Sequence, residues 1–194
     1  MMESQSSKTE YPVSSLIKKR RSKRAYLDKP VEQGKINSLF EAARWAPSSM
    51  NEQPWSYLYA TKDQKELWNK LFDTLMEGNK IWVKDAPLLV LSLARKNFKK
   101  NDKTNTTAKY DLGGANAFLS LQATEMGLNV HQMGGFDAHQ VRLDLNIPDE
   151  YEIGVIMAIG YPGDPDLLPE NLKQREVAPR FRKIQDTFVM NESF

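Results

Sequence analysis

The apolar run PLLVLSLA at residues 87–94 is the longest in the chain and limits the fold more than any other segment. It is far shorter than the ~20 apolar residues that a helix needs to cross a membrane. Its length and its leucine-rich composition instead predict a buried β-strand. The chain has 194 residues, and a domain of that size buries roughly 70% of the surface that its unfolded chain exposes. We therefore expect a single domain with this strand in its core.

The composition excludes several classes of protein and of site. With 40% hydrophobic and 27% charged residues, the chain is typical of soluble domains rather than of disordered, collagen-like or membrane proteins. It has no cysteine, which excludes disulfides, thiolate zinc sites, thiol nucleophiles and iron–sulfur clusters. Two histidines, His131 and His139, leave little basis for a metal site, and we expect none. The first thirteen residues lack the apolar stretch of a signal peptide, which predicts a cytoplasmic protein.

Hydrophobic periodicity predicts helices and strands along most of the chain. The predicted helices cover residues 32–45, 62–76, 112–126 and 137–145, and the predicted strands cover 55–60, 87–94, 128–132 and 152–160. Gly127 is expected to end the third helix, and Asp137 to cap the fourth. Residues 96–107 are polar and lack any period, which predicts an exposed, mobile loop.

Three parts are expected along the chain. Residues 1–13 form a flexible tail, residues 14–163 a core domain, and residues 164–194 a C-terminal arm. The arm is spaced by prolines and has few apolar residues, so we expect it not to bury itself on its own core. Its apolar and basic ending, RFRKIQDTFV, favours packing on another surface such as a second subunit. A disordered tail is the alternative.

The usual reactive motifs are absent from the sequence. It contains no GxSxG elbow, no GxxxxGK[ST] loop, no HExxH and no GxGxxG after a strand. The glycine pairs at 113–114 and 134–135 lack the spacing of a dinucleotide turn. Neither histidine has an evident partner serine, so we interpret both as structural. Any redox chemistry therefore needs a bound organic cofactor.

Positive charge is concentrated in one segment. Six of the seven residues from Lys18 to Arg24 are basic, and 21 basic against 25 acidic residues remain elsewhere. Arginines alternating with a serine can surround one phosphate dianion with guanidinium and hydroxyl donors. A solvated basic face or a nucleic-acid-binding patch is the other interpretation.

A second polar segment, APSSMNEQPW at residues 46–55, follows the first predicted helix. Its prolines make it rigid, and its hydroxyl and amide groups can hydrogen-bond a polyol or a heterocycle. Taken alone, it is also consistent with an ordinary turn.

Together with MGGFD at residues 133–137 and RFR at 180–182, these two segments occur in an order that resembles the flavin-dependent nitroreductase family. The resemblance covers residues 16–189. It implies an α+β fold with a central, mainly antiparallel sheet flanked by helices. It also implies an intertwined homodimer in which the C-terminal arm adds to the partner's sheet. Two FMN molecules would lie at the subunit interface.

The resemblance also implies which residues bind the cofactor. The 20–24 segment and the late arginines would hold the phosphate and ribityl chain, the 47–51 loop would reach across from the other subunit, and residues 133–135 would run along the ring near N5. Asn79 would lie beside the pyrimidine edge. The implied set is Arg20, Arg21, Ser22, Arg24, Pro47, Ser48, Ser49, Asn51, Asn79, Met133, Gly134, Gly135, Arg180 and Arg182. No side chain is required as a catalytic acid or base, because flavin N5 carries the chemistry.

The sequence departs from some relatives at two positions. Gly134 stands where they have an acidic residue, and Trp82 where they have a lysine. Arg24 is then the leading candidate for positive charge near flavin N1. The short segment at 96–107 replaces the extra helices that roof the site in several relatives, which predicts an open pocket.

The implied activity is an oxidoreductase that takes hydride from NADH or NADPH onto FMN and passes electrons to an electron-poor acceptor. A nitroaromatic or a quinone would be reduced in a ping-pong cycle, with no membrane or nucleic-acid partner. One alternative is a flavoenzyme of the same fold that dehalogenates or desaturates a specific metabolite. Another is a basic nucleic-acid-binding module, which would bind in a strongly salt-dependent way.

Overall fold

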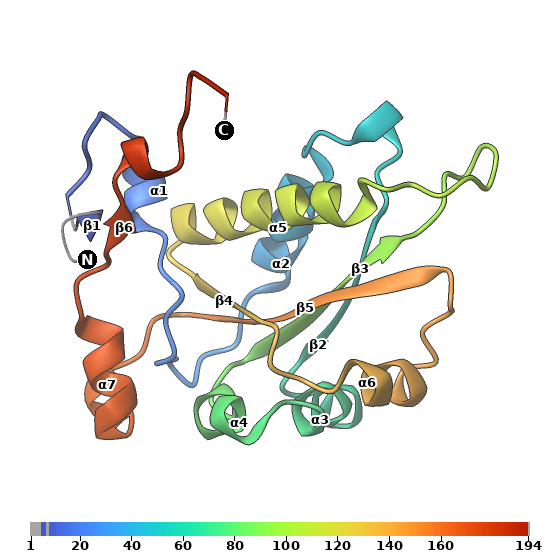
Figure 1. Ribbon diagram of the computed structural model, residues 1–194. Helices are drawn as coiled ribbons and strands as arrows, with labels where there is room; N and C mark the ends of the chain where they lie inside the picture. Colours follow the sequence, from blue (N-terminus) through green and yellow to red (C-terminus); the bar gives the residue numbers. More distant parts are fainter. Residues whose placement is uncertain (1–4, 7, 194) are drawn as a thin grey trace.

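A four-stranded antiparallel sheet forms the centre of the computed structural model, which describes residues 5–6 and 8–193 (Figure 1). Its strand order is β2-β3-β5-β4. The strands are β2 (Trp55–Thr61), β3 (Leu88–Arg95), β5 (Tyr151–Gly160) and β4 (Asn129–Met133). The predicted α+β class and antiparallel sheet are therefore confirmed.

Strand β3 is the buried strand that the 87–94 run predicts. It pairs with β2 along one edge and with β5 along the other. Its side chains alternate between two apolar clusters, with Leu89 and Leu91 on one face of the sheet and Leu88 and Val90 on the other. Because both clusters are buried, the strand is apolar at consecutive positions.

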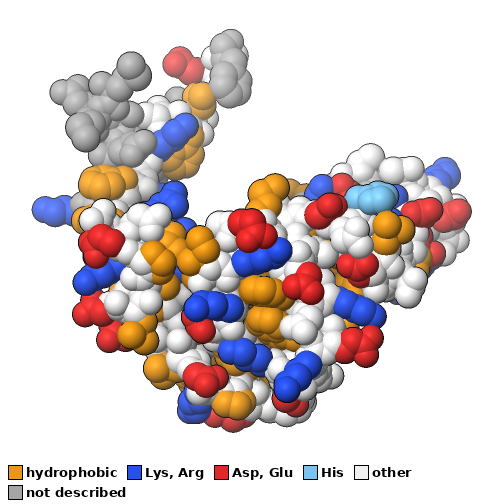
Figure 2. All heavy atoms as spheres, turned by 90° about the horizontal axis from the view of Figure 1, so that it is seen from below, with side chains coloured by type: hydrophobic (Ala, Val, Ile, Leu, Met, Phe, Trp, Pro, Cys, Tyr) orange, Lys and Arg blue, Asp and Glu red, His pale blue; other side chains and the backbone are white. Residues whose placement is uncertain are grey.

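Helices cover both faces of this sheet (Figure 1). Helices α2 (Gln33–Arg44) and α5 (Ala108–Glu125) lie on the face of Leu88 and Val90. Helices α3 (Lys65–Asp73), α4 (Glu77–Val83) and α6 (Ala138–Asp144) lie on the opposite face. Figure 2, seen from below, shows acidic and basic side chains interspersed over this face.

Two helix ends form as the sequence predicts. The Asp137 carboxylate accepts the Gln140 N–H at 2.9 Å and caps α6. Gly127 follows α5 with a φ of 74°, a conformation that glycine adopts without steric cost. The loop after β3 is mostly exposed, as predicted, and Asn97 and Thr104 form an antiparallel bridge within it. Its mobility stays a prediction. No helix among the described residues is long and apolar enough to span a membrane.

Described segments from near the two ends of the chain lie together beside the main sheet (Figure 1). Strand β1 (Gln5–Ser6) pairs with β6 (Arg182–Lys183), and helix α1 (Ser15–Lys19) follows β1 along the chain. The predicted flexible tail includes residues 1–4 and 7, which lie outside the described residues, whereas the pairing of β1 gives part of that tail regular structure.

The segment after residue 163 departs from its expected course. It contains η2 (Pro165–Leu167), α7 (Glu170–Val177) and η3 (Gln185–Thr187). Leu172 of α7 is buried in the apolar cluster of its own chain. The partly buried Leu168 packs against the same cluster. The expectation that this segment does not bury itself on its own core was therefore wrong for residues 168–172, because two leucines supply the apolar contact. Packing of residues 178–194 on a second subunit stays a prediction.

Candidate functional site

The basic segment at residues 20–24 lies against the chain segment at residues 176–182. Arg180 donates from Nη1 to the carbonyl of Arg20 at 2.5 Å and from Nη2 to the carbonyl of Lys18. Arg21 donates in the other direction, to the carbonyls of Glu176 (3.0 Å) and Ala178 (2.8 Å). These reciprocal bonds bring two segments together that are far apart in sequence. They also occupy donors of Arg21 and Arg180, which counts against an open nucleic-acid-binding patch.

Four arginines, Arg20, Arg21, Arg180 and Arg182, gather here without an acidic partner. The pKa of Arg20 is lowered by partial burial and then by the charges of Arg182 and Arg21. The pKa of Arg180 is lowered by burial and then by the charges of Arg21, Arg182 and Arg20. None of the four forms an ion pair with a carboxylate among the described residues. Arg20, Arg180 and Arg182 line an open groove of about 1180 Å³. Such a cluster is stabilised by a phosphate dianion.

Ser22 and Arg24 extend this cluster toward the sheet. The Ser22 hydroxyl accepts a hydrogen bond from Nη1 of Arg20 at 3.4 Å. The backbone N–H of Arg24 donates to both carboxylate oxygens of Glu176 at 3.0 Å, and the N–H of Ala25 donates to Oε1 at 3.3 Å. Glu176 is only 5% exposed. A buried carboxylate thus fixes the backbone of the arginine segment.

Trp82 and His131 connect the arginine segment to strand β4. The Arg24 guanidinium lies 6.0 Å from the ring centroid of Trp82. The ring centroids of Trp82 and His131 are 4.6 Å apart. His131 donates from Nδ1 to the carbonyl of Lys23 at 3.0 Å. Burial lowers the pKa of His131 to about 4, and the nearby charges of Arg24 and Arg20 act in the same direction. His131 is therefore neutral at pH 7, and its hydrogen bond to Lys23 is consistent with the structural role that the sequence predicts.

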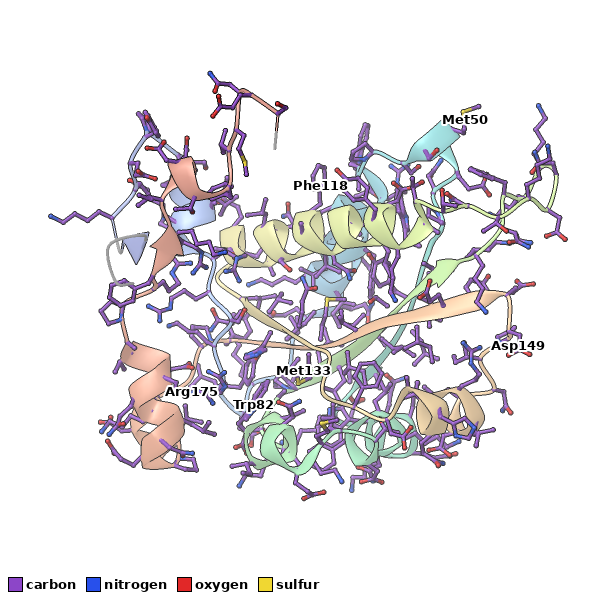
Figure 3. All side chains as sticks on the ribbon, in the orientation of Figure 1. Met50, Trp82, Phe118, Met133, Asp149 and Arg175 are labelled. Atoms are coloured by element: carbon purple, nitrogen blue, oxygen red, sulfur yellow. The ribbon has the colours of Figure 1, made fainter. Side chains whose placement is uncertain are left out.

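The predicted backbone segment at 133–135 begins where β4 ends. Asn79, on α4, donates from Nδ2 to the carbonyl of Gly135 at 3.0 Å, and the N–H of Met76 donates to the same oxygen at 3.0 Å. Met133 is buried in the cluster that contains Trp82, and Figure 3 shows both side chains at this end of the sheet. A Cβ on Gly134 would have no protein atom within 4 Å, so its backbone is open to a flat ligand.

The predicted loop at 47–51 lies elsewhere in the molecule. It connects α2 to β2 and includes η1 (Ser49–Asn51), and Figure 3 shows Met50 far from Trp82 and Met133. Pro47, at the end of α2, is exposed. Ser48 accepts the Gln53 N–H through Oγ at 2.9 Å. One chain therefore brings residues 20–24, 79, 133–135 and 180–182 together and leaves the 47–51 loop apart from them.

The 47–51 loop contains residues in a left-handed conformation and is hydrogen-bonded to a buried carboxylate. Met50 and Asn51 both have a φ of 54°, a left-handed conformation that costs a residue such as methionine roughly 1 kcal/mol or more, whereas asparagine adopts it more readily. The Ser49 N–H donates to Oδ2 of Asp111 at 3.1 Å, and the Thr107 hydroxyl donates to the same oxygen at 3.3 Å. Asp111 is 6% exposed. Its carboxylate supports a conformation that the loop sequence alone does not favour.

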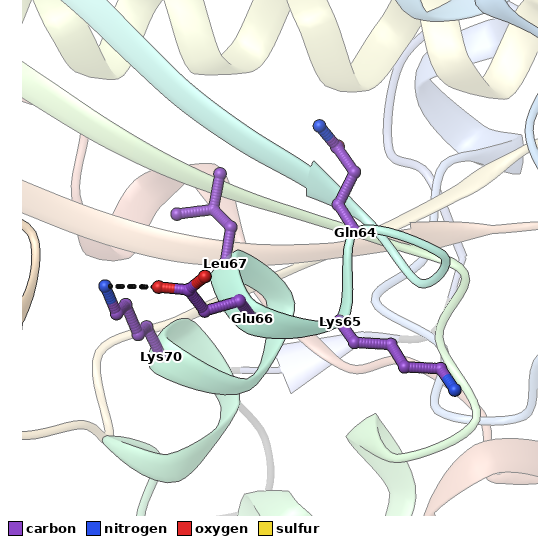
Figure 4. Close-up of a pocket in the computed structure, with 5 residues that line it drawn as sticks. All are labelled: Gln64, Lys65, Glu66, Leu67 and Lys70. Atoms are coloured by element: carbon purple, nitrogen blue, oxygen red, sulfur yellow. Dashed lines mark ion pairs between the residues drawn. The ribbon is translucent and has the colours of Figure 1, made fainter.

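A second hollow lies over the first turn of α3 (Figure 4). It has a volume of about 370 Å³, and an ion pair between Lys70 and Glu66 at 3.1 Å borders it. No residue of the predicted site lines it. Sequence patterns did not indicate Glu176 and Asp111, because neither belongs to a motif and both act on backbone groups that are distant in sequence.

Comparisons with known proteins agree with this geometry. The sequence model of the nitroreductase family matches residues 17–81 and 70–161. A protein of Rhodopseudomonas palustris named "Putative NADH dehydrogenase/NAD(P)H nitroreductase" is 26% identical over 179 residues, which cover 82% of this chain and 89% of that protein. The iodotyrosine deiodinase of Thermotoga neapolitana is 28% identical over 172 residues, covering 77% of this chain and 88% of the relative.

Solved structures give the same assignment. One structure, described as an oxidoreductase containing FMN, has a TM-score of 0.91 and 34% sequence identity, and the match covers 96% of this chain and 95% of that one. Another, a nitroreductase family protein of Clostridium difficile 630, has a TM-score of 0.72 and 28% identity over 92% of this chain and 97% of that one. The fold, the family match and the arrangement of the motifs all lead to one conclusion: the chain belongs to the nitroreductase family.

Proposed function

We propose that this protein is an FMN-dependent oxidoreductase that takes hydride from NADH or NADPH and reduces an electron-poor acceptor such as a nitroaromatic or a quinone. The observation that carries the proposal is the cluster of Arg20, Arg21, Arg180 and Arg182, which has no carboxylate partner among the described residues. The same segment continues to Arg24, which contacts Trp82, and Trp82 contacts His131 of the strand that ends at Met133. The R. palustris relative named as a nitroreductase and the related FMN-containing structure support it.

The residues present fit FMN. A phosphate monoester carries nearly two negative charges, which the free donors of Arg20 and Arg182 can neutralise, with Ser22 beside them. Asn79 uses Nδ2 on the carbonyl of Gly135, and its Oδ1 has no partner among the described residues, so it can accept from a ring N–H. Arg24 supplies positive charge for the pyrimidine side of the ring.

Bound FMN would supply hydride acceptance at N5 and electron transfer to the acceptor. The chain's own part is to bind and orient. The Gly134 backbone permits close approach of a planar ring, because no protein atom fills the space of a Cβ there. Neutral His131 holds the carbonyl of Lys23 and keeps the arginine segment against β4. The absence of a dinucleotide-binding motif fits a reductant that needs only an open ring face.

We propose further that two chains form the site together, with FMN at the interface. Helix α5 carries an exposed apolar stripe that includes Tyr110 (84% exposed), Ala117 and Phe118 (40% exposed). The terminal segments expose further large apolar side chains, namely Tyr11, Ile17, Phe188 and Val189. Groups of large exposed apolar side chains favour a protein interface. A partner chain would also bring its 47–51 loop to the arginine cluster, which one chain does not do.

Anaerobic spectroscopy and steady-state kinetics test this function. NADH or NADPH should bleach the flavin absorbance of the purified protein, and a nitroaromatic or a quinone should restore it. A ping-pong cycle predicts parallel double-reciprocal lines, because both substrates would use the same ring face. Intersecting lines would contradict shared occupancy, and an unbleached flavin would contradict the proposed reductant.

Reductive dehalogenation is the second candidate function, and the 28% identity to the T. neapolitana iodotyrosine deiodinase favours it over desaturation of a metabolite. Release of iodide from an iodotyrosine by the reduced protein would support it. Rapid reduction of nitroaromatics without halide release would favour the first proposal.

A further inference from the structure

A lysine-rich hairpin follows strand β3. Within residues 96–105 the Phe98 N–H donates to the carbonyl of Lys103 at 2.8 Å, and the Asp102 N–H donates to the carbonyl of Phe98 at 2.9 Å. The Asn105 N–H donates to the carbonyl of Lys96 at 2.7 Å. We call residues 96–105 the lysine hairpin. Its backbone is ordered by its own hydrogen bonds, although its sequence lacks any period.

The lysine hairpin carries a net positive charge. Lys96, Lys99, Lys100 and Lys103 are exposed, and none of them forms an ion pair among the described residues. The single acid of the hairpin, Asp102, accepts from Nδ2 of Asn97 at 3.1 Å.

Two further donors at the base of the hairpin lack acceptors. They are Nε of Arg95 and Nδ2 of Asn105, and both atoms are buried. Buried polar groups without a partner are rare in proteins. Because both atoms are buried, a ligand at the surface does not reach them, and the four exposed lysines are the groups that would attract an anionic ligand.

The lysine hairpin is bonded to the 47–51 loop region. The Lys99 N–H donates to Oε1 of Glu52 at 2.7 Å. Oδ1 of Asn105 accepts from the Thr107 N–H at 3.2 Å, and the Thr107 hydroxyl donates to Oδ2 of Asp111, the residue that holds Ser49. The hairpin, the start of α5 and the loop are thus one hydrogen-bonded unit. A ligand that the 47–51 loop approaches would therefore also lie near the lysines of the hairpin.

We propose that the lysine hairpin is an anion-recognising rim of the active site and selects substrates that carry a phosphate or a carboxylate. The inference rests on the proposed function, because it is the partner's flavin that the 47–51 loop would approach. The anionic group is either the 2′-phosphate that distinguishes NADPH from NADH or a carboxylate on the electron acceptor. Both have the charge that exposed lysines attract, and attraction from a charged rim also raises the association rate.

The test compares two triple variants of equal net charge. Lys99→Gln/Lys100→Gln/Lys103→Gln removes three charges from the hairpin. Lys62→Gln/Lys65→Gln/Lys84→Gln removes three exposed charges from around α3 and α4, and none of these lysines forms an ion pair within the described part of the chain. Stopped-flow reduction gives kcat/KM for NADPH and NADH, and reoxidation gives kcat/KM for 4-nitrobenzoate and 4-nitrobenzamide.

We expect the hairpin variant to lose about tenfold in one of the two anion-to-neutral ratios, a typical sum for a few exposed ion pairs. A lower NADPH/NADH ratio identifies the phosphate, and a lower 4-nitrobenzoate/4-nitrobenzamide ratio identifies the carboxylate. The control variant should keep both ratios within about twofold, the scale of surface substitutions. Unchanged ratios in the hairpin variant, or equal losses in the control, would overturn the proposal.

Calorimetric titration separates this proposal from the proposed function. Adenosine 2′,5′-bisphosphate and 4-nitrobenzoate are titrated into wild-type protein and both variants, with 5′-AMP and 4-nitrobenzamide as the less charged counterparts. This measurement needs no flavin reduction. Selective binding that is lost only in the hairpin variant supports the rim even if the protein reduces no acceptor, and binding that is equal in all three proteins contradicts the rim alone.

Discussion

Replacement of Glu176 by alanine tests how the arginine segment is held. The Glu176 carboxylate accepts the N–H of Arg24 at 3.0 Å and that of Ala25 at 3.3 Å, in a place that water reaches poorly. Glu176→Ala leaves both donors without an acceptor. A buried unsatisfied donor costs about 1–3 kcal/mol, and Arg24 is only partly buried, so we expect a loss of about 2–4 kcal/mol in the free energy of unfolding. Glu176→Gln keeps one oxygen acceptor and should lose about half as much.

Urea unfolding followed by tryptophan fluorescence measures this loss. Glu170→Ala is the matched control, because Glu170 begins the same helix and is exposed, and it should change stability by less than about 0.5 kcal/mol. Fluorescence titration with FMN gives a second measurement, in which Glu176→Ala should weaken binding by at least about tenfold if it displaces the arginines, equal to about 1.4 kcal/mol. Equal stability of Glu176→Ala and Glu170→Ala would refute the reasoning.

Three further predictions follow from the geometry. The pKa of His131 is lowered to about 4 in the folded state, so the unfolded chain binds an extra proton as pH falls below ~6.5, and stability should drop by about 2 kcal/mol between pH 7.5 and 5. Urea unfolding at both pH values should show this loss in His139→Gln and not in His131→Gln. Gly135→Ala would place Cβ 2.9 Å from Nδ2 of Asn79 and should lower the melting temperature, whereas Gly134→Ala should lower only FMN affinity in a fluorescence titration. Deletion of residues 179–194 spares α7 and should leave a folded monomer that binds no FMN. Light scattering measures the oligomeric state and absorbance measures bound flavin. A truncated protein that is still a yellow dimer would contradict the proposed interface.

Most of the central fold could be predicted from local pattern. Strand β3 and helix α2 follow from their apolar spacing, and the ends of α5 and α6 follow from Gly127 and Asp137. These signals are local, because each depends on residues within a turn or two of one another. Helices α4 and α7 were not predicted, since both are short and expose much of their surface.

Only the parts of the candidate site that lie in recognisable sequence motifs could be predicted from the sequence. The 20–24 and 133–135 segments have recognisable sequences, and the structure connects them through Trp82 and His131. Glu176 could not be found in this way, because the backbone group that it binds lies 152 residues earlier in the chain. An isolated glutamate in a polar helix looks like a surface residue until the fold buries it.

The most direct test of the central claim is the visible absorption spectrum of the purified protein, followed by heat release and chromatography of any chromophore. The arginine cluster and the open backbone at Gly134 predict a flavin spectrum and free FMN at about one molecule per chain, the stoichiometry of one cofactor site for each arginine cluster. A colourless protein that also fails to take up added FMN would contradict the account.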